Sequence, residues 1–348
     1  MSRTFERRPW IRRRSSKIGI TALALGIIAA LVWTLSPWPA TLLIRALFDS
    51  NAASTVEELE RYATDVPLTE TLDEEYGDSG ADTSLDVYSP AESSGPLTTV
   101  VWIHGGAWIS GDKSNVAPYA RNLAAEGFTV VAVNYTVSPE ATYPTALNEL
   151  NDALAYILDN AERLRVDPQN IVFAGDSAGA QLSAQLATAV TNPAYATTVG
   201  IAPSLSTDQL QGVILNCGIY DVSGIPNAPG LGGWGFRIAL WGYVGVKDWS
   251  STPGGEQMSV LDDVTADFPR TWISGGNADP LTASQSVPFA KTLSELGVDT
   301  TTLFYPEDHT EQLPHEYQFH LDFEDARSAF DSTVTFLNSI EGSRATSQ

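Results

Sequence analysis

Short apolar runs alternate with longer amphipathic segments over most of this chain. Seven runs, most of them rich in Val, Ile, Leu and Thr, predict strands at 84–88, 98–103, 129–134, 171–174, 213–217, 271–274 and 301–305. Apolar positions at helical spacing predict helices at 119–126, 145–160, 178–191, 283–296 and 326–340. Largely apolar strands that alternate with helices are typical of a mainly parallel sheet with helices on both faces. The pattern therefore predicts one α/β domain over 83–342.

The N-terminal segment has a different pattern. A basic stretch, 1–17, precedes an uncharged apolar run, 18–35, which at ~1.5 Å per residue approaches the ~30 Å core of a bilayer. This order predicts a single-pass signal-anchor in the plasma membrane, with 1–17 in the cytoplasm and the remaining domain outside it. A cleaved signal peptide, and hence a secreted protein, is the alternative. The anchor is favoured because the run exceeds a signal core of about 7–15 residues and no clear small-x-small cleavage site follows it.

The region 36–82 is expected to be a juxtamembrane or cap segment followed by a linker. Its apolar part, 40–48, is expected either to lie along the membrane surface or to pack as a cap on the domain. A short capped helix is predicted at 54–62, and the acidic stretch 73–82 is predicted to be a surface linker.

Charge and cysteine content narrow the possible partners. The 348 residues contain 19 basic and 42 acidic side chains, and seven of the basic ones lie within 1–17. The predicted domain is therefore strongly acidic, which disfavours nucleic acid as a partner. The single cysteine, Cys217, excludes an intrachain disulfide, and its place in an apolar run predicts a buried strand residue.

Two motifs at the ends of predicted strands suggest acyl-transfer chemistry. Gly-Asp-Ser-Ala-Gly at 175–179 joins the strand at 171–174 to the helix at 178–191, so Ser177 is expected to be exposed on a strained turn as a nucleophile. His-Gly-Gly at 104–106 follows the strand at 98–103 and offers backbone N–H groups to a developing oxyanion. His104 itself is expected to orient this loop.

A serine nucleophile needs a base, and the base needs a carboxylate that orients it. Asp279 lies in the loop after the strand at 271–274 and is the candidate acid; the alternative is a helix cap, a role that Thr282 or Ser284 could fill instead. Two histidines are candidate bases. His309 directly follows the last predicted strand, whereas His315 lies closer to the last helix.

Over roughly 84–340 the chain resembles the hormone-sensitive-lipase-like and feruloyl-esterase-like branch of the α/β-hydrolases. The resemblance rests on seven short motifs: HGGAW at 104–108, GDK at 111–113, NY at 134–135, PE at 139–140, YP at 143–144, GDSAG at 175–179 and DPL at 279–281. It implies the α/β-hydrolase fold and a serine hydrolase of carboxylic esters. The implied site residues are the nucleophile Ser177, the acid Asp279 and the N–H groups of Gly106, Ala107 and Ala178 as the oxyanion hole.

One position departs from that family pattern. Members commonly have Gly-Phe after the catalytic histidine, whereas Glu316-Tyr317 follows His315 here, and extra residues separate His315 from the last strand. Register to the final helix favours His315 as the base, and proximity to the strand favours His309. We predict His315.

An insertion at 222–265, between the strands at 213–217 and 271–274, is rich in Gly, Pro and Trp. Its aromatic residues are expected either to form a lid over the substrate pocket or to pack a subdomain. They include Trp234, Trp241, Tyr243 and Trp249.

The predicted protein is thus a membrane-anchored serine esterase that acts on a small-molecule ester. The alternatives are an amidase, such as a formamidase, or an acyltransferase with the same triad, and a non-catalytic surface module that kept the scaffold. No cofactor is expected, and no metal site either, because four scattered histidines and one cysteine offer no ligand spacing. The sequence does not predict an oligomeric state.

Overall fold

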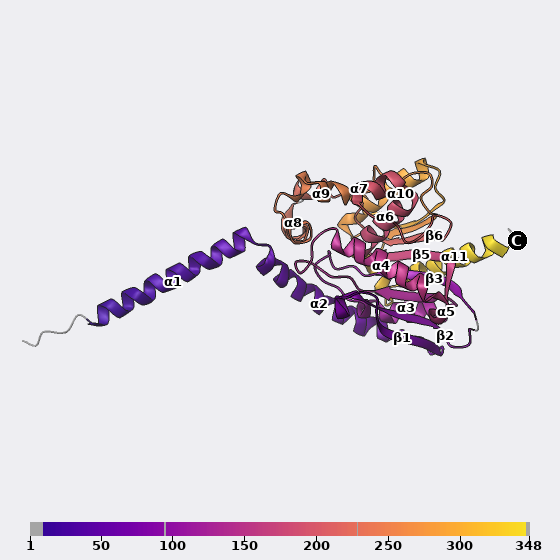
Figure 1. Ribbon diagram of the computed structural model, residues 1–348, viewed down its shortest axis with the longest axis horizontal. Coiled ribbons are helices and arrows are strands. Elements are labelled where there is room, and N and C mark those ends of the chain that lie inside the picture. Colours follow the sequence, from indigo (N-terminus) through magenta and orange to yellow (C-terminus); the bar gives the residue numbers. More distant parts are fainter. Residues whose placement is uncertain (1–9, 94, 228, 346–348) are drawn as a thin grey trace, which may run out of the picture.

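A twisted eight-stranded sheet forms the centre of the computed structural model, which describes residues 10–93, 95–227 and 229–345 (Figure 1). The strand order is β1-β2-β4-β3-β5-β6-β7-β8; β1 and β2 are antiparallel to their neighbours, and β3 to β8 run parallel. The strands are β1 Leu68–Glu75, β2 Ser84–Pro90, β3 Leu97–Ile103, β4 Thr129–Val133, β5 Val166–Asp176, β6 Leu210–Asn216, β7 Thr271–Gly275 and β8 Thr300–Phe304.

Helices cover both faces of the sheet, as the sequence pattern predicts. They are α3 Ala117–Ala125, α4 Thr145–Asp159, α5 Ala161–Leu164, α6 Ala178–Thr191, α7 Pro193–Val199, α8 Gly230–Val244, α9 Pro253–Gln257, α10 Val287–Glu295 and α11 Glu324–Ala345. A π-helical turn, Thr282–Ser286, precedes α10, and short 3-10 turns occur at Gly80–Thr83, Lys113–Asn115, Ile225–Asn227, Trp249–Ser251 and Tyr317–Phe319.

Alternating side chains of the central strands enter two separate cores. On β3, Val101 and Ile103 pack into the core shared with α4, α6 and α10, whereas Val100 and Trp102 pack into the core shared with α3 and α11. This alternation follows from the two-residue repeat of a strand, and burial on both faces explains why the strands are apolar along most of their length.

The edge strand β1 was not predicted. Its side chains are exposed or half-buried, and its pairing with β2 shifts register between Thr71 and Glu74. Its half-buried positions, Leu68, Thr71 and Glu74, are three residues apart and so do not follow the two-residue repeat of a half-buried strand. The predicted linker at 73–82 is therefore wrong over 73–75, and the sheet begins before the predicted domain start at 83.

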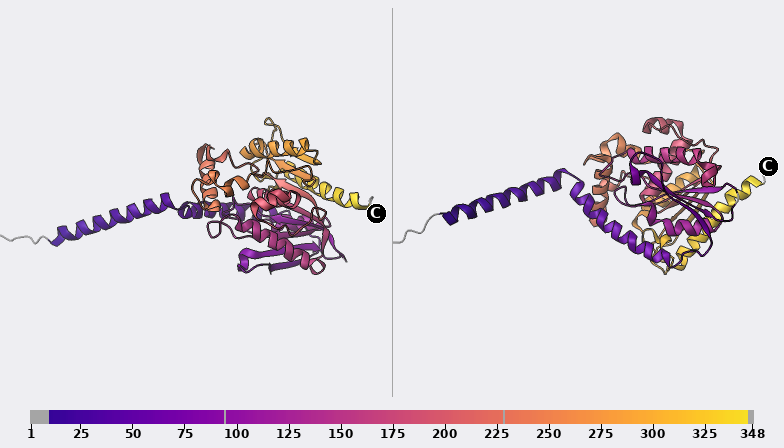
Figure 2. Two further views of the ribbon diagram at one scale, coloured as in Figure 1. Left: turned by 45° about the horizontal axis from the view of Figure 1, so that its top comes forward. Right: turned by 60° about the horizontal axis from the view of Figure 1, so that its bottom comes forward.

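Two helices precede the sheet. They are α1 Trp10–Leu35 and α2 Trp38–Glu60, and their axes bend by 73° at the break between them. Both views of Figure 2 show α1 projecting from the domain and α2 lying along it. Among the described residues no single helix is long and apolar enough to cross a membrane; the bent pair passes that test by length and composition alone. Residues 1–9 of the predicted basic segment lie outside the described part.

Helix α2 packs on the domain, which agrees with the cap interpretation of 40–48. Ala40, Thr41, Ile44 and Leu59 are buried, and the helix predicted at 54–62 is the last part of this longer one. Arg45 fastens α2 in place: its guanidinium donates to the carbonyl of Ile109 at 2.5 Å and to Glu140 at 2.8 Å.

Replacing Arg45 tests this attachment. Arg45→Met leaves the Ile109 carbonyl and the Glu140 carboxylate without their donor, so we expect the free energy of unfolding to fall by about 1–3 kcal/mol. Arg61→Met is the matched control, because Arg61 pairs with Asp322 where both side chains are more than half exposed, and it should cost at most about 1 kcal/mol. Equal losses in the two variants, measured by denaturant unfolding, would contradict the proposed attachment.

Candidate active site

Ser177 lies at a strained turn between β5 and α6. Its φ of 50° and ψ of −116° are unusual for a residue with a side chain. The flanking glycines are required sterically, because a Cβ on Gly179 would lie 2.0 Å from the carbonyl oxygen of Ile103, and one on Gly175 would lie 2.5 Å from Gly179. The strand, the turn and the helix therefore have the geometry of a nucleophile elbow.

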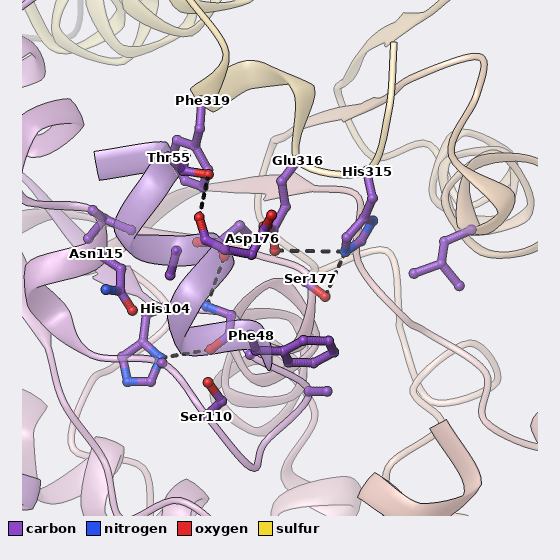
Figure 3. Close-up of a pocket in the computed structure, with 18 of the residues that line it drawn as sticks. Phe48, Thr55, His104, Ser110, Asn115, Asp176, Ser177, His315, Glu316 and Phe319 are labelled. Carbon is purple, nitrogen blue, oxygen red and sulfur yellow. Dashed lines mark hydrogen bonds and ion pairs between the residues drawn. The ribbon is translucent and has the colours of Figure 1, made fainter. Parts of the chain in front are cut away.

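His315 joins Ser177 to Asp279. Its Nε2 atom faces Ser177 Oγ (Figure 3) and lies 3.0 Å from it. Its Nδ1 atom lies 2.9 Å from Asp279 Oδ2. The Asp279 side chain is fully buried, and its second oxygen accepts a hydrogen bond from the N–H of Leu281 at 2.8 Å. The structure thus brings together the three side chains that the sequence analysis assigned to nucleophile, base and acid.

The loops that carry Asp279 and His315 are tied to each other. The N–H of Leu313 donates to the Asn277 side chain at 2.9 Å, and the N–H of Ala278 donates to the carbonyl of Leu313 at 3.0 Å. Gly276 permits this contact, because a Cβ there would lie 2.2 Å from the same carbonyl. These bonds fix the distance between Asp279 and His315 although the two residues are far apart in sequence.

His309 lies in a separate ion pair. Its Nε2 atom is 2.7 Å from Asp325 Oδ2, and its ring packs on Tyr305. The geometry therefore places His315, and not His309, beside Ser177.

The loop after β3 forms the wall of the site opposite His315. Gly106, Ala107 and Trp108 have φ values of 107°, 52° and 60°, and a Cβ on Gly106 would lie 2.2 Å from the carbonyl oxygen of Ser110. Among the described residues, the N–H groups of Gly106 and Ala107 have no hydrogen-bond acceptor. With the N–H of Ala178, the first residue of α6, they are the expected oxyanion donors.

His104 packs against the buried side of this loop. Its ring is buried, stacks on Tyr135 with centroids 4.4 Å apart, and contacts the carbonyl of Gly105 at 2.8 Å. Burial lowers the pKa of His104, so the ring is neutral near pH 7. This geometry fits the expected orienting role, and among the described residues no hydrogen bond joins His104 to Ser177, Asp279 or His315.

Burial and nearby acids set the protonation of the site. Burial opposes the charged form of His315, but Cys217, Asp279 and Glu316 outweigh it, and the pKa of His315 is raised well above 6.5. The hydrogen bond to Asp279 and the nearby Glu316 raise this pKa without any charge on Cys217, whose own pKa is raised by burial.

Three potential metal ligands occur together at this point. Cys217, Asp279 and His315 each place one ligand atom within 4.8 Å of the others. Two of these atoms, His315 Nδ1 and Asp279 Oδ2, are already bonded to each other, and a metal-bound thiol would be deprotonated, whereas this one is held protonated. The group fits an acid–base arrangement better than a metal site.

A cavity of about 330 Å³ opens above Ser177. Its apolar walls come from α2, α8 and the loops after β7 and β8, through Phe48, Phe236, Leu281 and Phe319. The insertion at 222–265 thus contributes Phe236, while Trp241, Tyr243 and Trp249 are buried in the packed core. The aromatic residues mostly pack a subdomain, as one of the two sequence interpretations expected.

Two contributors to the cavity were not assigned a role from the sequence. Helix α2 supplies Phe48, Asn51, Ala52 and Thr55, and Glu316 lines the cavity beside His315. The apolar run at 40–48 could have indicated that α2 contributes to the cavity. The replacement of the usual glycine after His315 could have indicated a role for Glu316.

The sequence model of the BD-FAE family matches residues 85–293, more than half of the chain. The chain belongs to the BD-FAE family. The match includes Ser177, Asp279 and the loop after β3 but ends before His315, whose placement therefore depends on the geometry.

Named esterases are among the chain's relatives. Esterase LipQ of Mycobacterium tuberculosis is 27% identical over 240 residues, which cover 67% of this chain and 55% of that protein. Carboxylesterase NlhH of the same organism is 38% identical over 111 residues, 32% of this chain and 35% of that one. The chain thus spans about half the length of the first relative and about a third of the second.

Solved structures of esterases share the fold. Esterase B from Lactobacillus rhamnosis superposes with a TM-score of 0.76 at 20% identity, covering 88% of this chain and 99% of that one. The hyperthermophilic esterase from Pyrobaculum calidifontis gives 0.67 at 22% identity, covering 86% and 94%. This BD-FAE member therefore has the α/β-hydrolase fold, as predicted.

Replacing His309 and His315 by alanine, one at a time, tests which of them acts on Ser177. In His315→Ala the Ser177 hydroxyl loses its proton acceptor, so we expect labelling by a fluorophosphonate to slow by several orders of magnitude. His309→Ala should keep the wild-type labelling rate and lower only thermal stability, since it loses the Asp325 contact. Fast labelling of His315→Ala beside an unreactive, folded His309→Ala would reverse the assignment.

Proposed function

We propose that this protein hydrolyses carboxylic esters through an acyl-enzyme on Ser177. The observation that carries the proposal is the position of His315, with Nε2 at 3.0 Å from Ser177 Oγ and Nδ1 at 2.9 Å from the buried Asp279. The elbow at Ser177 and the unpartnered N–H groups of Gly106 and Ala107 support the same chemistry. The named esterases among the relatives agree with it.

The proposed reaction has two halves. Ser177 Oγ attacks the ester carbonyl carbon while its proton passes to His315 Nε2, and the N–H groups at 106, 107 and 178 bind the oxyanion. His315 then gives the proton to the departing alkoxide. The alcohol leaves, and the acyl group stays bound to Ser177 Oγ. Water then gives a proton to His315 and attacks the acyl carbon. As the bond to Ser177 Oγ breaks and the acid leaves, His315 returns that proton to Ser177 Oγ. Throughout, Asp279 accepts the hydrogen bond from Nδ1–H and stabilises the imidazolium.

The cavity suits a small ester with an apolar acyl or alcohol group. Its volume of about 330 Å³ is at the small end of ligand pockets, and its walls are largely aromatic and aliphatic. Acetyl esterases occur among the chain's relatives, which supports short acyl groups as first substrates to test. Amides and acyl acceptors other than water belong in the same panel, because an amidase or an acyltransferase would use the same residues.

We also infer that the protein is anchored in the plasma membrane by its N-terminal helix, with the hydrolase domain outside the cytoplasm. The support is the exposed apolar surface of α1, which includes Ile20, Leu23 and Trp33, after a basic N-terminal segment. The outer face of α2 is apolar near α1, at Leu43 and Leu47, and becomes polar toward its end. Such a gradient fits a helix that leaves a membrane surface. Secretion after cleavage is the alternative.

Ser177→Ala is the direct test of the proposed chemistry. Purified protein should unfold at the wild-type temperature but hydrolyse a 4-nitrophenyl acyl ester several orders of magnitude more slowly, because the members of a triad act as a unit. Turnover near the wild-type rate in this variant would show that the chemistry lies elsewhere.

The raised pKa of His315 predicts the pH dependence of hydrolysis. The base must be neutral to accept the Ser177 proton, so kcat/KM should rise with pH through the His315 pKa and level off above it. Because that pKa is raised, the midpoint of the rise should lie above 6.5, the ordinary histidine value. A midpoint below that value in the wild-type profile would contradict the charge arrangement described here.

Cell fractionation tests the membrane anchor. The full chain should sediment with membranes, and protease added to intact cells should remove the hydrolase domain. A shortened protein in the medium would instead support the secreted form.

A further inference from the structure

Glu316 has a backbone conformation that disfavours a side chain. Its φ of 60° and ψ of 30° are in the left-handed region, where a residue other than glycine costs about 1 kcal/mol or more. Its carbonyl accepts the N–H of Phe319 at 3.0 Å and so helps to form the turn Tyr317–Phe319. Glycine would form the same turn without this cost, so the backbone alone does not explain a glutamate here.

The side chain of Glu316 places a second carboxylate on His315. Its Oε1 atom lies 3.7 Å from His315 Nε2, on the opposite side of the ring from Asp279, and the side chain is 31% exposed at the cavity wall (Figure 3). The same oxygen lies close to the loop after β3, since a Cβ on Gly105 would be 3.1 Å from it. Glu316 therefore lies between His315 and the start of the loop after β3.

Among the described residues that line the cavity, His315 is the one side chain that can offer a positive charge to the Glu316 carboxylate. No lysine or arginine is among the described residues that line the cavity. Asp176 lies beside Glu316 but is buried, and burial, together with Glu316, raises the pKa of Asp176 well above its ordinary value. Of these two carboxylates, Glu316 is the one with access to solvent, since its side chain is 31% exposed and Asp176 is buried.

The other titratable groups that face this pair come from four strand ends. Asp279, after β7, is bonded to Nδ1 on the far side of His315. Cys217, after β6, is held as a neutral thiol by burial, and His104, after β3, is held as a neutral ring. Asp176 ends β5. Glu316 is thus the charged group placed to act on Nε2 and on the cavity.

We propose that Glu316 is a positioning residue that stabilises the protonated form of His315 and makes the cavity select against anionic esters. The proton that leaves Ser177 Oγ stays on His315 Nε2 until the leaving oxygen takes it, and Glu316 itself gains no proton. A substrate carboxylate in the cavity would meet the Glu316 charge with no basic side chain to offset it. This inference rests on the proposed ester hydrolysis.

Two replacements of Glu316 separate its charge from its backbone role. Glu316→Gln removes the charge and keeps the shape, whereas Glu316→Gly removes the charge and relieves the left-handed backbone. Glu311→Gln is the control, because Glu311 is exposed in the same loop and does not line the cavity. Each variant would be assayed on two 4-nitrophenyl esters of equal acyl length, one ending in a methyl group and one in a carboxylate.

Both Glu316 variants should change the same two observables. The rise of kcat/KM with pH should move to lower pH, because loss of the negative charge makes His315 easier to deprotonate. The preference for the neutral over the anionic ester should fall by about tenfold, as expected for removing one like charge at close range in a partly solvated site. Glu316→Gly should unfold at or above the wild-type temperature, and Glu311→Gln should match wild type in all three measurements.

A Glu316→Gln protein with the wild-type pH profile and the wild-type ester preference would overturn the inference. Equal changes in Glu311→Gln would also overturn it, because they would indicate a general effect of loop charge. If the wild-type protein hydrolyses neither ester, the proposed function itself fails and this inference fails with it. An active wild type with an unresponsive Glu316 leaves the proposed function standing.

Discussion

The close approach of three backbone segments around Ser177 is the constraint on which the rest of the site depends. Gly179, in the first turn of α6, lies so close to the end of β3 that no side chain fits between them, and Gly175, near the end of β5, lies similarly close to α6. This packing forces Ser177 into its strained conformation and aims the start of α6 at the cavity. It also sets the N–H of Ala178 next to the loop after β3. One packing arrangement thus positions the proposed nucleophile and the proposed oxyanion donors together.

A second, independent set of contacts positions His315 and Asp279, the proposed base and acid. Parallel strands end at the same edge of the sheet, which brings the loops after β5, β7 and β8 together. The bonds between Asn277, Ala278 and Leu313 then fix the acid loop to the histidine loop. A carboxylate lies near each nitrogen atom of His315, Asp279 at Nδ1 and Glu316 at Nε2. Burial keeps the neighbouring Cys217 thiol and His104 ring neutral.

The sequence predicted the features that depend on local pattern and missed those that depend on tertiary context. The parallel strands were predicted because burial on both faces makes them apolar. The turn at Ser177 was predicted because any such turn needs small residues on both sides of the serine. Strand β1 was missed because an exposed edge strand lacks that pattern, and α2 was predicted too short because its buried face is defined only by the domain it covers. Loop length alone could not tell whether His309 or His315 lies beside Ser177; that depends on tertiary contacts, with Asp325 for His309 and with Asp279 for His315.

The most direct test of the central claim is to trap the acyl-enzyme. The protein would be mixed with an ester whose acyl group is hydrolysed slowly, quenched in acid and digested, and the peptide that contains Ser177 would be weighed by mass spectrometry. The account predicts a mass increase equal to one acyl group on Ser177 in the wild-type protein, formed far more slowly when Asp279 is replaced by Asn because His315 then loses the carboxylate that orients it. Rapid ester turnover with no adduct on Ser177, or with the acyl group on another residue, would contradict it.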